Sequence, residues 1–132
     1  MPVLSVEHIA CNVSDPVAIA AWYVEHLGMR IVRSVPTPPH IHFLADAGGR
    51  VVIEMYSNPA DPVPDYRSMH PLRLHLAFAA DDPDTARAAL VSAGATFVDE
   101  QALADGSRLL MLRDPWGLAI QLCKRTTPLL PV

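Results

Sequence analysis

The sequence contains an internal repeat with a constant offset of 67 residues. The segment HIACNVSDP starts at His8 and the segment HLAFAADDP starts at His75, so that histidine, alanine, aspartate and proline recur in step. Further along, the same offset places Glu54 on Gln121 without a gap, 46 residues after each histidine. One offset that aligns both the beginning and the end of each half is typical of a duplicated unit, and we therefore predict two copies of one module.

Each copy is predicted to contain a strand, a helix and three further strands, in that order. Alternating apolar and β-branched residues indicate the strands, whereas an Asp-Pro pair before an apolar run indicates the start of each helix. The first copy has predicted strands at 3–13, 29–35, 41–45 and 51–57, and a helix at 18–27. The second copy has predicted strands at 72–80, 95–99, 108–112 and 118–124, and a helix at 83–93.

Two such modules predict an α+β fold with mostly antiparallel strands and with helices covering one face of the sheet. We expect the first module to span residues 1–58 and the second to span residues 71–125. Residues 59–70 are proline-rich and are predicted to form a linker with little regular structure, and residues 126–132 a C-terminal tail. A chain of 132 residues suits this plan, because it is too short for two independently stable domains of common size.

The charge distribution argues against several classes of partner. The net charge is -4 and the ten lysines and arginines are scattered, so no basic stripe is available for a phosphate backbone. No apolar stretch approaches the roughly 18 residues of a membrane-spanning helix. We therefore expect a soluble, cytoplasmic protein without a nucleic-acid or membrane partner. Cys11 and Cys123 lack CxxC spacing, which indicates buried, reduced thiols.

Four polar residues share one face of their predicted strands. Side chains alternate along a strand, and in each of four strands one set of alternate positions is uniformly apolar. The other set contains His8, Glu54, His75 or Gln121 among small or polar neighbours. Two imidazoles, a carboxylate and an amide oxygen can together bind a divalent metal ion such as Zn, Ni, Co, Mn or Fe.

Each of these residues also has an ordinary structural interpretation. A single strand histidine is more often a hydrogen-bonded structural or surface residue than a metal ligand, and Glu54 alone could face solvent on an open sheet. The common offset and the common face favour a metal site. Tyr56 and Arg73 have the same alternation and are candidates to bind substrate, and His42 and Trp116 are candidates for the cavity mouth.

Several segments together resemble a known superfamily. These are EHIACNVSDP, WYVEHLGMRIV, VVIEMYS, LHLAFAADDP and RDPWGLAIQLCK, which cover the chain from about Leu4 to Lys124. The chain is similar in these segments to the vicinal oxygen chelate superfamily, which includes glyoxalase I, bleomycin-resistance proteins, epimerases and extradiol dioxygenases. The combination of Tyr23, Leu27-Gly28 and the turn Asp114-Pro115-Trp116-Gly117 carries most of the resemblance.

The resemblance implies a fold and a ligand set. It implies two paired βαβββ modules that form a cupped sheet with helices on the outer face. It also implies metal ligands at the first and last strand of each module, which are His8, Glu54, His75 and Gln121 here, and a homodimer as the common assembly. Gln121 departs from the pattern, because glyoxalase I and the dioxygenases usually have glutamate there. An amide cannot carry a proton, so the role of the base would pass to Glu54, as in the mirrored arrangement of the family's epimerases.

Three functions are compatible with this fold and this set of candidate ligands. The first is a glyoxalase-like lyase or isomerase/epimerase that uses one divalent metal and acts on a small substrate chelating it through vicinal oxygens. The second is a non-haem iron dioxygenase, which has two histidines and one carboxylate. The third is a metal-free protein that binds a small molecule such as an antibiotic and confers resistance. Retention of three ligands and a fourth donor favours the first.

Overall fold

The computed structural model describes residues 2–130 of the chain. The chain divides into two compact units, Met1–Pro64 and Asp65–Val132. No helix within residues 2–130 combines the length and apolar character needed to cross a membrane.

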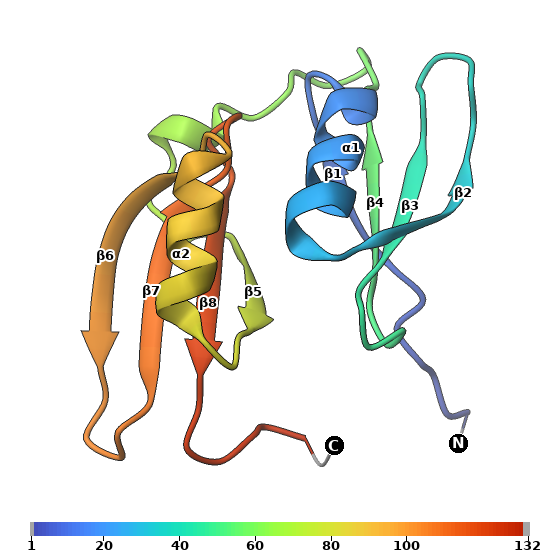
Figure 1. Cartoon of the computed structure of the whole chain (residues 1–132). Coiled ribbons are helices and arrows are strands. Elements are labelled where there is room, and N and C mark those ends of the chain that lie inside the picture. The colour runs from blue at the N-terminus through green and yellow to red at the C-terminus, as the bar shows by residue number, and fades with distance from the viewer. Residues whose placement is uncertain (1, 131–132) are drawn as a thin grey trace. The chain divides into compact units, whose positions relative to one another are not determined.

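The first unit is a four-stranded mixed sheet with one helix packed on it (Figure 1). The strands have the spatial order β1-β4-β3-β2, in which β1 and β4 are parallel and the other two pairs are antiparallel. Its elements are β1 (Ile9–Asn12), α1 (Pro16–Leu27), β2 (Arg30–Ser34), β3 (His42–Ala45) and β4 (Val52–Tyr56).

The second unit repeats this topology with the order β5-β8-β7-β6. Again the first and last strands are parallel and the other pairs antiparallel. Its elements are β5 (His75–Ala79), α2 (Pro83–Ser92), β6 (Thr96–Ala102), β7 (Arg108–Arg113) and β8 (Ala119–Lys124). The α+β class and the mostly antiparallel strands are thus confirmed, with one parallel pair in each sheet.

The strand register reproduces the sequence repeat. Ala10 pairs with Glu54 in the first unit, and Ala77 pairs with Gln121 in the second, at the same offset of 67 residues. The duplicated segments therefore occupy equivalent positions in two copies of one βαβββ module.

Both helices begin in the same way. Asp15 and Asp82 are the N-cap residues, and their carboxylates accept hydrogen bonds from the backbone N–H groups of Ala18 and Thr85. A proline follows each cap, at a position where no N–H donor is needed. Helix α1 ends at Gly28, whose φ of 67° is the left-handed conformation that glycine adopts readily.

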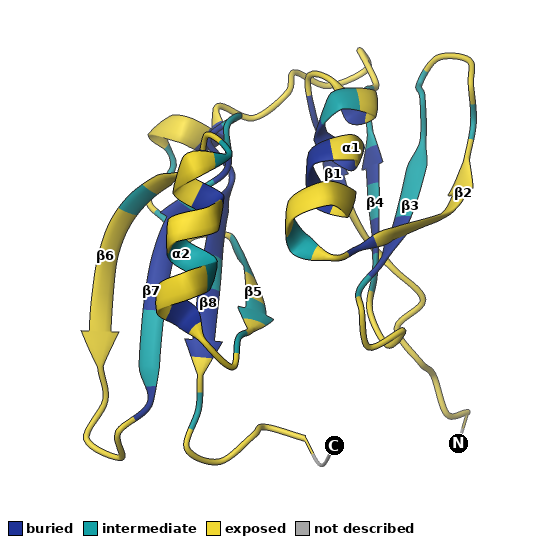
Figure 2. Cartoon of the chain, in the orientation of Figure 1, coloured by how far each residue is buried: buried dark blue, intermediate teal, exposed yellow. Residues whose placement is uncertain are grey.

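Each helix covers one face of its own sheet, and the core of each unit lies between that helix and that sheet. Leu44, Ile53 and Met55 are buried on the face covered by α1, and their counterparts Leu112, Ile120 and Leu122 are buried on the face covered by α2. Figure 2 shows that β7 and β8 carry most of the buried positions of the second sheet, while the edge strands β2 and β6 are largely exposed. Cys11 and Cys123 are buried free thiols, as predicted.

Several boundaries differ from the sequence-based prediction. The first strand begins at Ile9 instead of residue 3, and Val3, Leu4 and Val6 are 82–94% exposed. Alternation predicted a strand there, but in the described residues no neighbouring strand supplies hydrogen-bonding partners for it. Strand β5 begins at His75, because residues 71–73 form a turn closed by a hydrogen bond from Arg73 N–H to the carbonyl of His70.

The segment predicted as a linker contains a short 3₁₀ helix, η1 (Tyr66–Ser68), with Tyr66 buried. Arg113 holds this segment to the second sheet, since its guanidinium donates hydrogen bonds to the carbonyl oxygens of Tyr66 and Met69 at 2.9 and 2.7 Å. Residues 65–70 therefore belong structurally to the second unit.

Candidate functional site

The face of each sheet that its helix leaves uncovered, named here the open face, carries the candidate ligands. In the first module, His8 immediately precedes β1 and Glu54 is the central residue of β4. His8 Nε2 lies 3.7 Å from Glu54 Oε2, and the His8 ring packs edge-on against Phe43 with centroids 5.5 Å apart. The first module thus brings an imidazole nitrogen and a carboxylate oxygen together on its open face.

The spacing of these two atoms suits a shared cation. Two ligands of a tetrahedral site with metal–ligand bonds of about 2.1 Å lie roughly 3.4 Å apart. The observed 3.7 Å is close to that value and longer than a hydrogen bond. The side chains of His8 and Glu54 are 33% and 16% exposed, so both remain accessible to a small ion.

The opposite nitrogen of the His8 ring has a different partner. His8 Nδ1 lies 3.0 Å from Glu7 Oε1, a carboxylate oxygen that accepts a hydrogen bond from it. In a neutral imidazole this leaves the lone pair on Nε2, the atom that faces Glu54. A carboxylate behind a histidine in this way orients the ring as metal-binding proteins commonly do.

His75 has an equivalent arrangement in the second module. It is the first residue of β5, and its Nδ1 donates a hydrogen bond to the carbonyl oxygen of Pro71 at 2.9 Å. Because a carbonyl oxygen only accepts, Nδ1 carries the proton and Nε2 has the free lone pair in the neutral ring. Both candidate histidines therefore present Nε2 as the available donor atom.

Gln121 occupies the position of Glu54 but has another environment. Its Oε1 accepts a hydrogen bond from Cys123 Sγ at 3.4 Å. Burial raises the pKa of the Cys123 thiol, and also that of Cys11, so both are protonated donors near neutral pH. Gln121 also lines a pocket of about 120 Å³ on the open face of the second module, together with Met111 and Asp99.

The four weaker candidates are placed differently. Tyr56 lies two residues after Glu54 on the same face of β4 and is partly buried. Arg73 is in the turn before β5. Trp116 is in the β7–β8 turn, where its backbone N–H donates a hydrogen bond to the carboxylate of Asp114. His42 pairs with Met55, so its side chain lies on the helix-covered face, and its Nδ1 contacts the carbonyl oxygen of His40 at 2.7 Å. The structure therefore does not bring His42 to Glu54.

No group of three or more histidine, cysteine, aspartate or glutamate side chains suited to a metal occurs within either module as far as residues 2–130 show. Each module contributes two of the four predicted donors: His8 and Glu54 in one, His75 and Gln121 in the other.

Arg113 is a residue that the sequence-based prediction missed. Besides Tyr66 and Met69, its guanidinium donates to the carbonyl oxygen of Gly117 at 3.0 Å. It thereby fixes the segment that leads to Pro71, whose carbonyl orients His75. The only sequence signal was an arginine directly before the Asp-Pro-Trp-Gly turn, and a strand-end arginine gives no indication of which carbonyls it will reach.

Comparisons with known proteins agree with this architecture. The family model described as "Glyoxalase/Bleomycin resistance protein/Dioxygenase superfamily" matches residues 5–122. Among curated proteins, none matches the chain.

Solved structures with the same fold cover nearly all of the chain. A glyoxalase family protein from Bacillus cereus superposes with a TM-score of 0.76 at 17% identity, covering 93% of this chain and 95% of that one. TnmS3, an antibiotic-binding protein from Streptomyces sp. CB03234, has a TM-score of 0.70 at 24% identity, with 92% and 96% covered. A glyoxalase family protein from Enterococcus faecalis has a TM-score of 0.66 at 27% identity, with 91% and 97% covered.

Proposed function

Because the chain belongs to the glyoxalase/bleomycin resistance protein/dioxygenase superfamily, we propose that it is a metal-dependent enzyme of the lyase or isomerase/epimerase type. Its substrate is a small molecule with vicinal oxygens. The proposed ligands are His8, Glu54, His75 and Gln121, and the metal is Zn, Ni, Co, Mn or Fe. The observation that carries the proposal is the matched presentation of Nε2 by both histidines, each with its Nδ1 committed to an oxygen.

The donor set fits such a cation. Two neutral imidazoles, one carboxylate and one amide oxygen give a net charge of -1, which offsets part of a divalent charge. Glu54 is mostly buried, and the imidazole of His8 is its one polar contact in residues 2–130. A carboxylate with so few hydrogen-bond donors gains stability from a nearby positive charge. The proposal rests on the chemistry of each pair and on the register of each sheet.

The chemistry divides among the residues as follows. A bound divalent metal acts as a Lewis acid that lowers the pKa of the C–H beside a chelated carbonyl. Glu54 removes that proton with its carboxylate and returns it at the same or the neighbouring carbon. His8 Nε2 and the Glu54 carboxylate, 3.7 Å apart, would be held together by the shared cation, and Glu7 orients the His8 ring through Nδ1. Gln121 binds through its amide and has no proton to exchange near neutral pH, so the base function falls to Glu54.

A second candidate function is supported by the pocket beside Gln121. A protein that binds a small molecule without metal chemistry would use such a pocket, and TnmS3 with the same fold is an antibiotic-binding protein. This alternative requires no role for Glu54. The iron dioxygenase is less well supported, because Gln121 would occupy a coordination position that oxygen needs.

We also propose that the protein acts in the cytoplasm as a homodimer. Two buried free cysteines are typical of a reducing compartment. The exposed apolar side chains of Val3, Leu4 and Val6 would lose contact with water if they packed against a second copy. Light scattering of the intact chain, and of a Val3→Ser/Leu4→Ser/Val6→Ser variant, tests the assembly.

Metal content tests the enzyme proposal. Protein purified without chelator is expected to contain about one equivalent of metal, measured by mass spectrometry, and His8→Ala and His75→Ala should each lose it. His26→Ala is a matched control, because His26 Nε2 also lies 3.7 Å from a glutamate, Glu25, but on the surface of α1. The proposal is overturned if the wild type holds no metal and takes up none of the five ions by calorimetry. Retention of metal by both histidine variants would have the same consequence.

A further inference from the structure

The pocket on the open face of the second module contains a row of three side chains that cross the sheet. Asp99 on β6 pairs with Met111 on β7, and Met111 pairs with Gln121 on β8. All three line the pocket, and Gln101 and Leu109, which also pair with each other, form the next row. The proposed ligand Gln121 is therefore at one end of a continuous surface and the carboxylate of Asp99 at the other.

Asp99 reaches this face because of a β-bulge. In a regular strand, Phe97 and Asp99 would point to the same side, since side chains alternate. The register shifts between them, so Phe97 pairs with Leu112 of the buried face, whereas Asp99 pairs with Met111 of the open face. Arg87 of α2 lies 3.3 Å from the Phe97 ring centroid, which places Phe97 on the helix side. Bulges that re-aim a side chain in this way are common next to functional sites.

The pocket carries a negative charge at one position, the carboxylate of Asp99. Among residues 2–130, no lysine or arginine lines the pocket, and Asp99 is the one carboxylate that does. His70 also lines it, and its Nδ1 accepts a hydrogen bond from Leu72 N–H at 3.1 Å, a contact that only a neutral ring can make. Arg108 pairs with Asp84 and Glu100, and Arg113 donates to three carbonyls. Arg73 follows Leu72 in the turn before β5, but it is not among the residues that line the pocket.

The remaining walls set the size and polarity of a ligand. Leu109 and Met111 provide an apolar floor, and the amides of Gln101 and Gln121 provide hydrogen-bonding groups on either side of it. A volume of about 120 Å³ is comparable with the cavity of about 150 Å³ that holds a benzene ring in other proteins. The site therefore suits a compact apolar group that ends in a positively charged donor.

We propose that this pocket binds a protonated amine attached to a small apolar body, with Asp99 as the specificity-determining residue. That the amine is part of the substrate rests on the proposed function, whereas binding itself does not. In the substrate, the amine would lie beside Asp99 and the vicinal oxygens toward Gln121.

Three probes of nearly equal shape test this proposal: benzylamine, benzyl alcohol and benzoate. Each is titrated into isotope-labelled, metal-free protein at pH 7.5, and the backbone amide signals of residues 98–101 and 109–111 are followed by NMR. Benzylamine is expected to bind about two- to fivefold more tightly than benzyl alcohol, because it pairs with a solvent-exposed carboxylate. Benzoate is expected to bind least, and higher salt should weaken only the amine.

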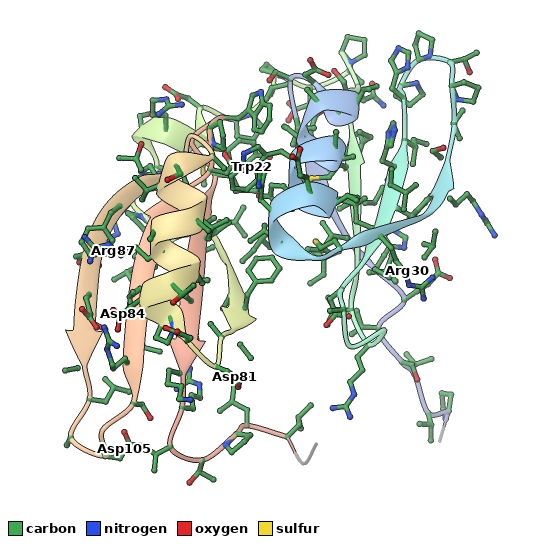
Figure 3. The ribbon with its side chains drawn as sticks, viewed as in Figure 1. Trp22, Arg30, Asp81, Asp84, Arg87 and Asp105 are labelled. Carbon is green, nitrogen blue, oxygen red and sulfur yellow. The ribbon has the colours of Figure 1, made fainter. Side chains whose placement is uncertain are left out.

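Variants identify the carboxylate responsible. Asp99→Asn should reduce benzylamine binding to the level of benzyl alcohol, and Asp99→Glu should restore most of the difference. Asp81→Asn is the matched control: it makes the same charge change in the loop before α2 (Figure 3), and Asp81 does not line the pocket. The proposal is overturned if benzoate binds as well as benzylamine, if Asp99→Asn has no effect, or if no probe shifts these signals.

The outcome is separable from that of the metal experiment. Amine binding without any metal uptake would support this pocket and refute the enzyme proposal, leaving the binding protein as the function. Metal uptake without amine selectivity would refute the pocket assignment and leave the metal site standing.

Discussion

The two modules have the same backbone plan but a different distribution of charge across the open face. In the first module, Glu54 is at the centre of the row and Arg33 is at its edge, with Phe43 between them. In the second module, Gln121 is at the centre and Asp99 is at the edge, with Met111 between them. The central carboxylate of one copy is thus an amide in the other, and the edge residue changes from a cation to an anion.

Both edge residues reach the open face through a β-bulge at the equivalent place. The register shifts between Ile31 and Arg33 in β2, as it does between Phe97 and Asp99 in β6. The duplication therefore retained the backbone irregularity while the side chains it presents diverged. Because the backbone geometry is shared while the side chains differ, we expect the two copies to have different chemical roles.

The largest effect is expected from removing the central residue of each row. Glu54→Ala should weaken metal binding by at least roughly 100-fold, more than the loss of an outer-shell partner, because it removes a charged ligand. Gln121→Ala should weaken it by only about tenfold, since a neutral amide contributes less charge. Calorimetric titration with Zn and Co measures both. Equal losses would show that the two central positions are equivalent and contradict the division of roles.

The fold could be predicted from the sequence because the repeat shows the same order of strands and helix in two independent copies. Periodicity within one copy was ambiguous at the ends of strands, but the same elements at the same offset fixed their number and order. The ends were less predictable. Residues 3–8 alternate like a strand, yet a strand also requires a neighbour with free hydrogen-bonding groups, which a sequence pattern does not specify.

The candidate site was only partly predictable. Alternation assigned Glu54 and Gln121 each to the open face of its own sheet, and the regular register of β4 and β8 agrees with this. It did not reveal Asp99, because strict alternation from Phe97 would place Asp99 on the helix-covered face. His42 was a candidate for the cavity mouth, although the register with Met55 places its side chain on the helix-covered face of the first sheet. Bulges and register depend on contacts between strands, so a pattern along one strand cannot contain them.

The turn between the last two strands of each module contains a glycine, and the two turns should differ in how well they tolerate its replacement by alanine. Gly117 in the β7–β8 turn has φ 96°, and a Cβ atom there would lie 2.7–2.9 Å from atoms of Arg67, including its backbone. Gly49 in the β3–β4 turn has φ 67° and open space around it. Gly117→Ala should therefore lower the free energy of unfolding by about 2–3 kcal/mol, and Gly49→Ala by about 1 kcal/mol, measured with urea. Similar losses would contradict the close packing of Arg67 on this turn.

Two arginines on the open faces should contribute very differently to stability. Arg113→Met removes three hydrogen bonds to carbonyl oxygens and should cost about 2 kcal/mol in the free energy of unfolding. Arg33→Met on the exposed edge strand β2 should change it by less than about 0.5 kcal/mol. Hydrogen exchange should also become faster at residues 66–73 in the Arg113 variant alone. Unchanged exchange in this segment would mean that other contacts hold it in place.

The smallest difference is expected at the helix N-caps, and it depends on pH. The Asp82 carboxylate accepts hydrogen bonds from the Thr85 hydroxyl and from the Thr85 N–H, whereas Asp15 accepts one from the Ala18 N–H. The hydrogen bond from the Thr85 hydroxyl has the larger effect on the pKa of Asp82, and the one from the Thr85 N–H the smaller. Both lower this pKa, so the ionised form is favoured in the folded protein. Its contribution is complete above the unfolded pKa of about 3.9 and is lost as the pH falls through the lower, folded value. Asp82→Asn should therefore reduce the melting temperature at pH 7 by more than Asp15→Asn does, and the gap to wild type should narrow as the pH falls below about 3.9. Thr85→Val should reduce the same pH dependence, and a gap that persists unchanged in acid would show that the Asp82 cap does not act through its charge.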